Sequence, residues 1–309
     1  MKKSILWMLL FILTSFVFVS CSDDEDNIVP QNPTDYTSAL QYIEASGFNG
    51  SILFRKGNTD VVRQGFGMAD IAANIPNNKD THFRIGSMSK AFTSLGIVQL
   101  KREGYITSLA QPINDFAEDF PFGDQITLRH LLTHSSGLPD HVGAFEEVIQ
   151  NQNLFFTPED ILDAYAEALV EDGLQFSPGT LTSYSNANYL LLGLLIEDLA
   201  EIPYHDYFVQ NNFGQLGMQN TYLSPYELVE NGEAKGYKEG SLVAPYPVEI
   251  AFGAGDWVSN LGDMEKWGDA WMNNLITTSE KEDVFPMPVS EGEITSFGMG
   301  WFTIRIGGT

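Results

Sequence analysis

The chain has 309 residues, of which 43% are hydrophobic and 18% charged, a composition typical of a folded globular protein with one large domain or two smaller ones. Its 41 acidic and 16 basic residues give a formal charge of -25, so no basic surface is expected to neutralise phosphates, and nucleic acid is excluded as the expected partner. The single cysteine, Cys21, excludes an internal disulfide and excludes zinc or iron–sulfur sites built from cysteines.

The N-terminus has the pattern of a signal peptide. Two lysines precede an apolar run over residues 5–19, which at 15 residues is shorter than the roughly 20 that a membrane-spanning helix needs. The sequence Val19-Ser20-Cys21 then resembles the bacterial lipobox, which implies that residues 1–20 are removed and that Cys21 is lipidated. The alternative is an ordinary secretory signal with an incidental cysteine.

An acidic, polar segment follows at residues 21–36 and is predicted to be a disordered tether. Its acidic run, directly behind the cysteine, resembles the surface-export signals of some Gram-negative lipoproteins, and the alternative is a plain solvated linker. The expected location is the bacterial cell envelope, where the lipid is expected to lie in the outer membrane. Whether the protein is exposed at the cell surface is left open.

The body, predicted as one domain over residues 37–309, begins with a β-hairpin. Residues 50–56 and 59–67 are rich in β-branched and aromatic side chains and flank the turn signal Gly57-Asn58. Residues 87–104 carry apolar side chains on most faces, a pattern that predicts a central helix buried by several neighbours.

A helical block is expected at about residues 105–240. Within it, Thr157 to Asp160 has the pattern of a helix start with proline at the first position, and residues 188–200 predict a leucine-rich buried helix. One more helix is expected at 261–274 and a strand at 298–306. This order predicts an α/β fold, in which an antiparallel sheet is flanked by helices, the helical block is an inserted subdomain, and the functional site lies at the seam.

Ser87 and Lys90 are the first candidates for chemistry. Residues three apart lie on one helix face, so the Lys90 amine is expected beside the Ser87 hydroxyl. Ser87 also stands where the helix should begin, and there unpaired N–H groups and the helix dipole favour a developing negative charge. Burial in an apolar helix should favour the neutral amine, which is a base. The alternative is a solvated helix face, but a buried unpaired charge is costly enough to favour a functional role.

Tyr184-Ser185-Asn186 is a second motif and precedes the leucine-rich helix. The Tyr184 phenol could relay a proton to a leaving group, and the Asn186 amide could bind a substrate carbonyl. Taken alone, the motif favours a loop tyrosine that packs its ring and an Asn186 that caps the helix. The presence of both motifs favours the catalytic interpretation.

The segment Phe83 to Lys90, followed by Tyr184 to Asn186, resembles the serine β-lactamase and penicillin-binding-protein superfamily, nearest its class C β-lactamase, esterase and D-peptidase branch. The resemblance runs from about Gly47 to Ile306. Three further stretches resemble that branch, at residues 126–139, 253–256 and 297–301.

This resemblance implies a β-lactamase-like fold with Ser87 as acyl-accepting nucleophile, Lys90 as its base, Tyr184 as proton relay and Asn186 as substrate contact. The backbone N–H of Ser87 is implied as one oxyanion donor. No metal and no cofactor are expected. The expected partners are a small acyl substrate or peptide and, through the lipid, a membrane; the oligomeric state is not indicated.

The family's third motif, Lys-Thr-Gly or His-x-Gly, normally follows the strand that is expected here to end at Ile306. The chain offers Gly307-Gly308-Thr309 there, which does not match. From this we expect an incomplete sheet in a C-terminally truncated chain that is poorly soluble and nearly inactive.

His130, His134 and His141 raise the possibility of a metal site, because the first two have a metal-ligand spacing. No glutamate follows the first histidine, as a zinc protease would require. A structural role is favoured, with His134 bonded to backbone in a loop beneath the site.

The leading hypothesis is an envelope-anchored, metal-free serine hydrolase that acts through an acyl-enzyme on amide, ester or β-lactam carbonyls. The alternative is a non-catalytic envelope binding protein that retains the fold, or an inactive fragment.

Overall fold

The computed structural model describes residues 36–57, 59–145, 147, 156–223, 233–243, 247–273, 275, 280, 284 and 295–304. The chain divides into two units, Met1–Phe48 and Asn49–Thr309. In the first unit, helix α1 (Tyr36–Ala45) begins at the last residue of the expected tether. The expected signal peptide, Cys21 and the rest of the tether lie outside the described residues. Across the described ranges, no helix has the length and apolar character to cross a bilayer.

In the second unit, a long hairpin and several short strands pair in antiparallel fashion. The strands are β1 (Gly50–Lys56), β2 (Thr59–Phe66), β3 (Met68–Asp70), β4 (Ile75–Pro76), β5 (Phe83–Arg84), β6 (Tyr222–Leu223), β7 (Tyr237–Lys238), β8 (Ser241–Leu242), β9 (Trp257–Ser259), β10 (Thr295–Phe297) and β11 (Phe302–Ile304). Strands β5, β9 and β6 form a three-stranded sheet in that order, and the others form two-stranded pairs. The predicted hairpin is confirmed, and so is the mixed fold of helices and antiparallel strands.

The α-helices of this unit lie within the expected helical block and on either side of it. They are α2 (Ser89–Glu103), α3 (Leu128–Leu132), α5 (Pro158–Asp172), α6 (Ala187–Ala200), α7 (Tyr204–Phe208), α8 (Gly214–Leu216) and α9 (Leu261–Met272). Strands β6 and β7 lie inside the range that we expected to be helical, so the described helices of that block end at Leu216. The reason is long-range pairing, because Tyr222 and Leu223 align with Val258 and Trp257 of β9.

The start of α5 is the one that its sequence predicts. The Thr157 hydroxyl accepts the Asp160 N–H at 3.2 Å, and the Asp160 carboxylate accepts the Thr157 N–H at 2.9 Å. Pro158 takes the first helical position, where its missing N–H costs nothing. This reciprocal cap satisfies two N–H groups at the helix end.

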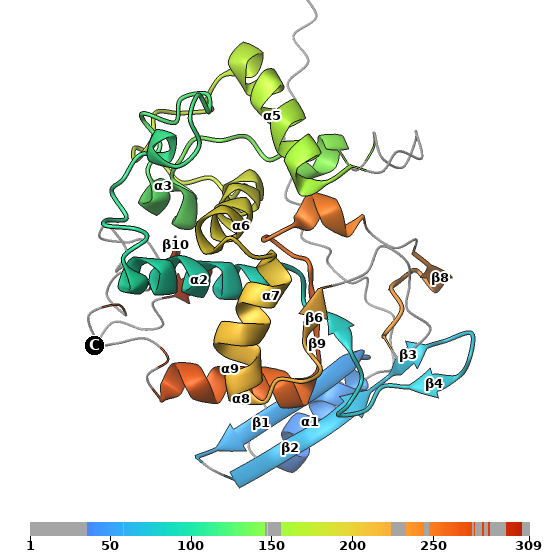
Figure 1. Cartoon of the computed structure of the whole chain (residues 1–309). Helices are drawn as coiled ribbons and strands as arrows, with labels where there is room; N and C mark the ends of the chain where they lie inside the picture. Colours follow the sequence, from blue (N-terminus) through green and yellow to red (C-terminus); the bar gives the residue numbers. More distant parts are fainter. Residues whose placement is uncertain are drawn as a thin grey trace, which may run out of the picture. The chain divides into compact units, whose positions relative to one another are not determined.

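Helix α2 runs through the core beside α6, as Figure 1 shows. Phe92 on α2 is fully buried and meets the rings of Phe213, Trp257 and Trp267 edge to face, with centroids 5.1, 5.9 and 4.4 Å away. Truncating such a ring to alanine typically costs about 3–5 kcal/mol. The prediction of a central helix buried by several neighbours is therefore confirmed.

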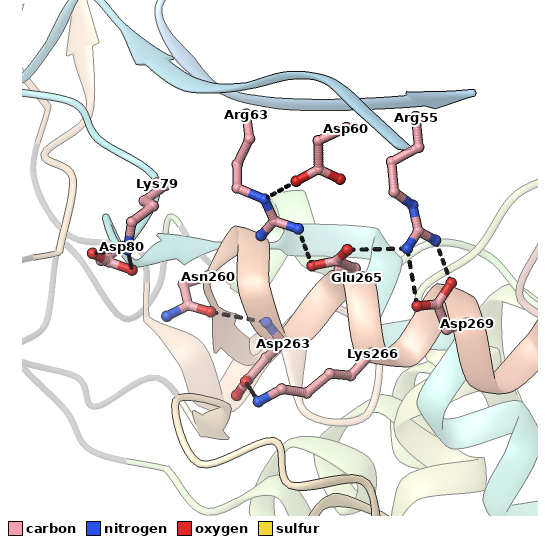
Figure 2. A network of polar contacts seen from close by, with 10 residues as sticks. All are labelled: Arg55, Asp60, Arg63, Lys79, Asp80, Asn260, Asp263, Glu265, Lys266 and Asp269. Atoms are coloured by element: carbon pink, nitrogen blue, oxygen red, sulfur yellow. Dashed lines mark hydrogen bonds and ion pairs between the residues drawn. The ribbon is translucent and has the colours of Figure 1, made fainter. Parts of the chain in front are cut away.

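Ion pairs join the β1–β2 hairpin to α9 (Figure 2). Arg55 and Arg63 both reach the Glu265 carboxylate, and Arg55 also bonds Asp269. Arg63 is held in place by Asp60, whose carboxylate lies 2.7 Å from Nε. Each partly exposed pair is worth only about 0.2–1 kcal/mol, so the shared carboxylate positions the hairpin on the helix more than it stabilises the fold.

The strand expected at residues 298–306 is confirmed only in part: residues 302–304 form β11, residues 298–301 do not form a strand, and residues 305 and 306 lie outside the described residues. The chain instead turns between β10 and β11, where the Gly298 N–H donates to the Trp301 carbonyl at 2.7 Å and Gly300 has a φ of 75°. Glycine adopts this left-handed conformation without steric cost, so the strand breaks there. A Cβ on Gly300 would lie 2.5 Å from the Lys90 carbonyl oxygen, so the turn packs directly on α2.

Candidate active site

The nucleophile candidate lies at a sharp turn between strand and helix. Strand β5 pairs with β9, and the Ile85 N–H donates to the Trp257 carbonyl at 2.9 Å. Gly86 then takes a φ of 52°, which redirects the chain into a 3-10 turn over Gly86–Met88 that leads into α2. Ser87 is therefore exposed at the start of a buried helix, close to where the sequence predicts it.

Lys90 lies one turn further on and is 2% exposed. Its Nζ lies 2.7 Å from the Asn186 Oδ1, 2.7 Å from the Ala254 carbonyl oxygen and 3.2 Å from the Ser87 Oγ. A neutral amine has two N–H groups and one lone pair. Because the two carbonyl oxygens can only accept, they take the two N–H groups, and the lone pair faces the Ser87 hydroxyl. This geometry suits Lys90 as the base that takes the Ser87 proton.

Burial also supplies the protonation state that a base requires. Desolvation lowers the pKa of Lys90 from 10.5 to about 7, against the opposing charges of Asp140 and Asp256. A substantial fraction of the amine is therefore neutral near pH 7, where an ordinary lysine would be almost wholly charged.

Tyr184 approaches Ser87 from the loop before α6. Its hydroxyl lies 2.6 Å from the Ser87 Oγ, and its ring centroid lies 4.9 Å from the Lys90 Nζ. Burial raises the pKa of Tyr184, so the side chain is a phenol that carries a proton. Since the Ser87 proton points to Lys90, Tyr184 donates to the Ser87 oxygen and is placed to pass its proton onward.

His134 supports the Tyr184 ring. The two rings stack with centroids 4.5 Å apart, and the His134 Nδ1 lies 3.2 Å from both the Ser185 N–H nitrogen and the Asn188 Nδ2. Burial lowers the pKa of His134 to about 3, so it is neutral and accepts both donors at Nδ1. The expectation that His134 bonds backbone in a loop beneath the site is confirmed.

His130 and His141 are also bonded within the fold. The His130 Nδ1 accepts the Thr127 N–H at 3.2 Å at the start of α3, and the His141 Nε2 lies 2.9 Å from the Ile250 carbonyl oxygen. In the parts of the chain that the structure describes, no group of three or more His, Cys, Asp or Glu side chains is arranged to hold a metal ion.

Asn186 bridges Lys90 and a residue that the sequence did not single out, Asp140. The Asn186 Oδ1 accepts from Lys90, while its Nδ2 donates to the two Asp140 oxygens at 3.1 and 3.3 Å. In this structure Asn186 therefore positions the base. Its predicted contact with substrate remains a prediction.

The turn at residues 253–256 holds the carbonyl of Ala254 against Lys90. Asp256 is buried, and its Oδ2 accepts the Gly253 N–H at 2.9 Å, which closes the turn. Gly253 has a φ of 67°, and a Cβ there would lie 2.4 Å from the Tyr189 carbonyl oxygen on α6. Burial raises the pKa of Asp256 to about 7.

A cleft of about 280 Å³ opens beside Ser87. Apolar side chains form most of its wall, and Arg84 and Asn186 contribute polar groups; the apolar residues are Val142, Val248, Ala251 and Ala254. On the other side of Ser87, Phe297 packs against His134 and Tyr184, with ring centroids 5.1 and 6.1 Å apart. An acyl group can thus approach the exposed hydroxyl while the base stays buried.

The four side chains predicted for the site, those of Ser87, Lys90, Tyr184 and Asn186, are brought together by the fold. The family description Beta-lactamase matches residues 44–303 of this chain. The chain belongs to the beta-lactamase family. This membership confirms the resemblance that the two motifs indicate and the β-lactamase-like fold class.

The chain is also similar to individual proteins and solved structures. A penicillin-binding protein of Bacillus subtilis (strain 168) is 29% identical over 278 residues, which cover 84% of this chain and 60% of that protein. The structure of D-amino acid amidase from Ochrobactrum anthropi SV3, complexed with L-phenylalanine amide, is similar with 27% identity and a TM-score of 0.75, covering 88% of this chain and 82% of that one. The penicillin-binding protein from Bacillus halodurans has 26% identity and a TM-score of 0.73, covering 86% and 83%.

These likenesses within the beta-lactamase family support the prediction of a serine hydrolase. The chain spans 52 to 63% of the length of the curated relatives that it matches. The activity of the whole protein is therefore treated below as a proposal.

Three contributors to the site were not identified from the sequence. Asp140 lies in a loop, Phe297 is the last residue of strand β10, and the carbonyl of Ala254 belongs to the backbone. The signal that could have pointed to them is the resemblance of residues 126–139, 253–256 and 297–301 to the same family branch. Asp140 directly follows the first of these stretches.

Proposed function

We propose that this protein is a serine hydrolase that forms an acyl-enzyme at Ser87 with amide, ester or β-lactam carbonyls. The observation that carries the proposal is the environment of Lys90. Two carbonyl oxygens accept its two N–H groups, so its lone pair is directed at the Ser87 hydroxyl. A binding protein gains nothing from a buried, desolvated amine, so this arrangement argues against the non-catalytic alternative.

The proposed reaction has two halves. As the Ser87 Oγ attacks the substrate carbonyl, its proton moves to the Lys90 Nζ, and the negative charge on the carbonyl oxygen is met by the Ser87 N–H. The Tyr184 phenol gives its proton to the leaving amine or alcohol, and the proton that Lys90 took from Ser87 restores the phenol. Water then attacks the acyl-enzyme and loses a proton to Lys90, which passes that proton to the Ser87 Oγ as the acid leaves.

The apolar cleft beside Ser87 supports an acyl group with a hydrophobic side chain. The likeness to D-amino acid amidase supports amides of amino acids as the first substrates to test, ahead of esters and β-lactams.

Covalent labelling tests the proposal. A fluorophosphonate is expected to add one group to the protein, and mass spectrometry is expected to place it on the peptide that contains Ser87. The same preparation is assayed with D- and L-phenylalanine amide, p-nitrophenyl acetate and a chromogenic cephalosporin. No adduct at Ser87, together with no turnover of any of these substrates, would favour the binding-protein alternative.

We further propose that Cys21 is lipidated and anchors the protein in the bacterial envelope. The proposal is supported by the apolar run at residues 5–19 and the lipobox-like sequence that ends in this cysteine. With a charge of -25 on the chain, attraction to an anionic membrane surface would not anchor the protein, so the lipid must do so.

Cys21→Ser is expected to move the protein from the membrane fraction to the soluble fraction and to remove the lipid mass from its N-terminal peptide. The neighbouring Ser22→Ala is the matched control and is expected to remain lipidated. A Cys21→Ser protein that stays membrane-bound contradicts the anchor.

A further inference from the structure

Asp140 makes three hydrogen bonds to a single residue of the site. One carboxylate oxygen accepts the Asn186 backbone N–H at 2.8 Å, and the two oxygens accept the Asn186 Nδ2 at 3.1 and 3.3 Å. The side chain of Asp140 is exposed, so burial does not explain its position. The hydrogen bonds that the structure describes for this carboxylate hold Asn186 in place.

These bonds allow one orientation of the Asn186 amide. A carboxylate only accepts hydrogen bonds, so it holds the NH2 side of the amide and leaves the Oδ1 toward Lys90, 2.7 Å away. The reversed amide would place its NH2 against the Lys90 amine and its oxygen against the Asp140 carboxylate. The contact between the two oxygens would be repulsive, and Lys90 would lose the acceptor for one of its N–H groups.

We propose that Asp140 is a positioning residue, which fixes the Asn186 amide and thereby directs the Lys90 lone pair at Ser87. The inference rests on the proposed function, because it concerns the base of that reaction. If the amide were free to turn, Lys90 would lose one of the two acceptors that define the direction of its lone pair.

The charge of Asp140 acts on Lys90 as well. The groups that face the Lys90 amine are the carboxylates of Asp140 and Asp256, the rings of Tyr184 and Tyr189, and the neutral His134. Both carboxylates raise the pKa of Lys90 against the larger lowering by burial. Removing the charge at residue 140 should therefore lower that pKa further.

Asp140→Asn keeps the shape of the side chain and tests both effects. The amide at residue 140 has a single oxygen that can accept the Asn186 N–H groups. Its own NH2 group would face the Asn186 NH2 group, and two donors cannot form a hydrogen bond. We expect kcat to fall by about 10- to 100-fold, the scale of a misplaced catalytic group, with KM changing less. The acid limb of the kcat profile should move to lower pH, and the Lys90 pKa measured by NMR on protein with ¹⁵N-labelled lysine should fall.

The double variant Asp140→Asn, Asn186→Asp exchanges the two groups. A carboxylate at residue 186 accepts from Lys90 in either orientation and also from the new amide at residue 140. We expect kcat on the high-pH plateau to recover to within about threefold of wild type, the scale of the remaining small displacement. With the negative charge now next to Lys90, the acid limb should move above that of wild type.

Asp160→Asn is the matched control, since the Asp160 carboxylate also accepts a backbone N–H, at the start of α5 and away from Ser87. It is expected to lower thermal stability slightly and to leave kcat and its pH profile unchanged. If Asp140→Asn behaves in the same way, the inference is overturned and Asp140 is only a loop cap. If wild type turns over none of the substrates, the proposed function fails. Equal Lys90 pKa values in wild type and Asp140→Asn would overturn the inference about Asp140, whatever the activity.

Discussion

Ser87→Ala is expected to abolish fluorophosphonate labelling and to lower turnover by about 10⁴- to 10⁶-fold, the scale seen when a hydrolase loses its nucleophile. The Ser87 Oγ is the hydroxyl within hydrogen-bond distance of the Lys90 amine, and it lies exposed at the cleft. Residual turnover would come only from substrate binding and the backbone N–H groups. Intact-protein mass spectrometry and steady-state kinetics measure both effects.

Ser89→Ala is the control for this variant. Ser89 lies two residues further on, but its hydroxyl is buried and accepts the Trp257 backbone N–H at 3.2 Å. This variant is expected to fold and to be labelled at Ser87. Undiminished labelling of Ser87→Ala would mean that the acyl-accepting residue lies elsewhere.

Lys90→Met is expected to lower kcat by about 10²- to 10⁴-fold, the usual contribution of a general base, with a smaller effect on KM. Methionine fills a similar volume and leaves the Ser87 hydroxyl without a base. In wild type, the fall in kcat toward acid pH should have a midpoint near the Lys90 pKa of about 7. That midpoint should be absent from the residual activity of Lys90→Met.

The same substitution should change how stability depends on pH. Between about pH 7 and 10, the unfolded chain holds a proton on Lys90 that the folded chain does not, because burial lowers the folded pKa from 10.5 to about 7. Wild-type stability therefore rises with pH in this window and is reduced below it. Relative to Lys90→Met, the free energy of unfolding of wild type should rise by about 1.4 kcal/mol per pH unit.

Urea unfolding at pH 7, 8 and 9 measures this difference. Groups whose pKa does not depend on Lys90 cancel in this comparison, which leaves Lys90 and the buried Asp256 carboxyl, whose pKa the Lys90 charge lowers. Lys56→Met, at an exposed position in β1, is the control and should follow wild type across the series. A constant difference between wild type and Lys90→Met would show that the folded protein does not keep the amine neutral.

The parts of the fold that follow from local physics were predictable from the sequence. The cap at Thr157 and the burial of the helix at Ser89–Glu103 depend on neighbours in the chain or on one periodic pattern. The short strand β5 was not identified, because two residues carry no periodicity and its partner β9 lies far along the chain. The break at Gly300 was also missed, since an alternating pattern on both sides conceals one residue with a left-handed φ.

For the site, the Ser87–Lys90 spacing and the Tyr184–Asn186 motif identified the side chains that converge. The sequence could not show which way each group points. The direction of the Lys90 lone pair depends on a backbone carbonyl, that of Ala254, and on an amide held by Asp140. Such contacts exist only after distant loops have met.

The contacts between distant segments that build the site also affect the order of folding. Ser87 and Tyr184 are separated by 97 residues, and Lys90 and Ala254 by 164. Closing loops of this length costs chain entropy before any contact repays it, so these contacts are expected to form late in folding. Until they form, a partly folded chain carries the serine without an oriented base. The reactivity of Ser87 is thus withheld until the loops that direct Lys90 have docked.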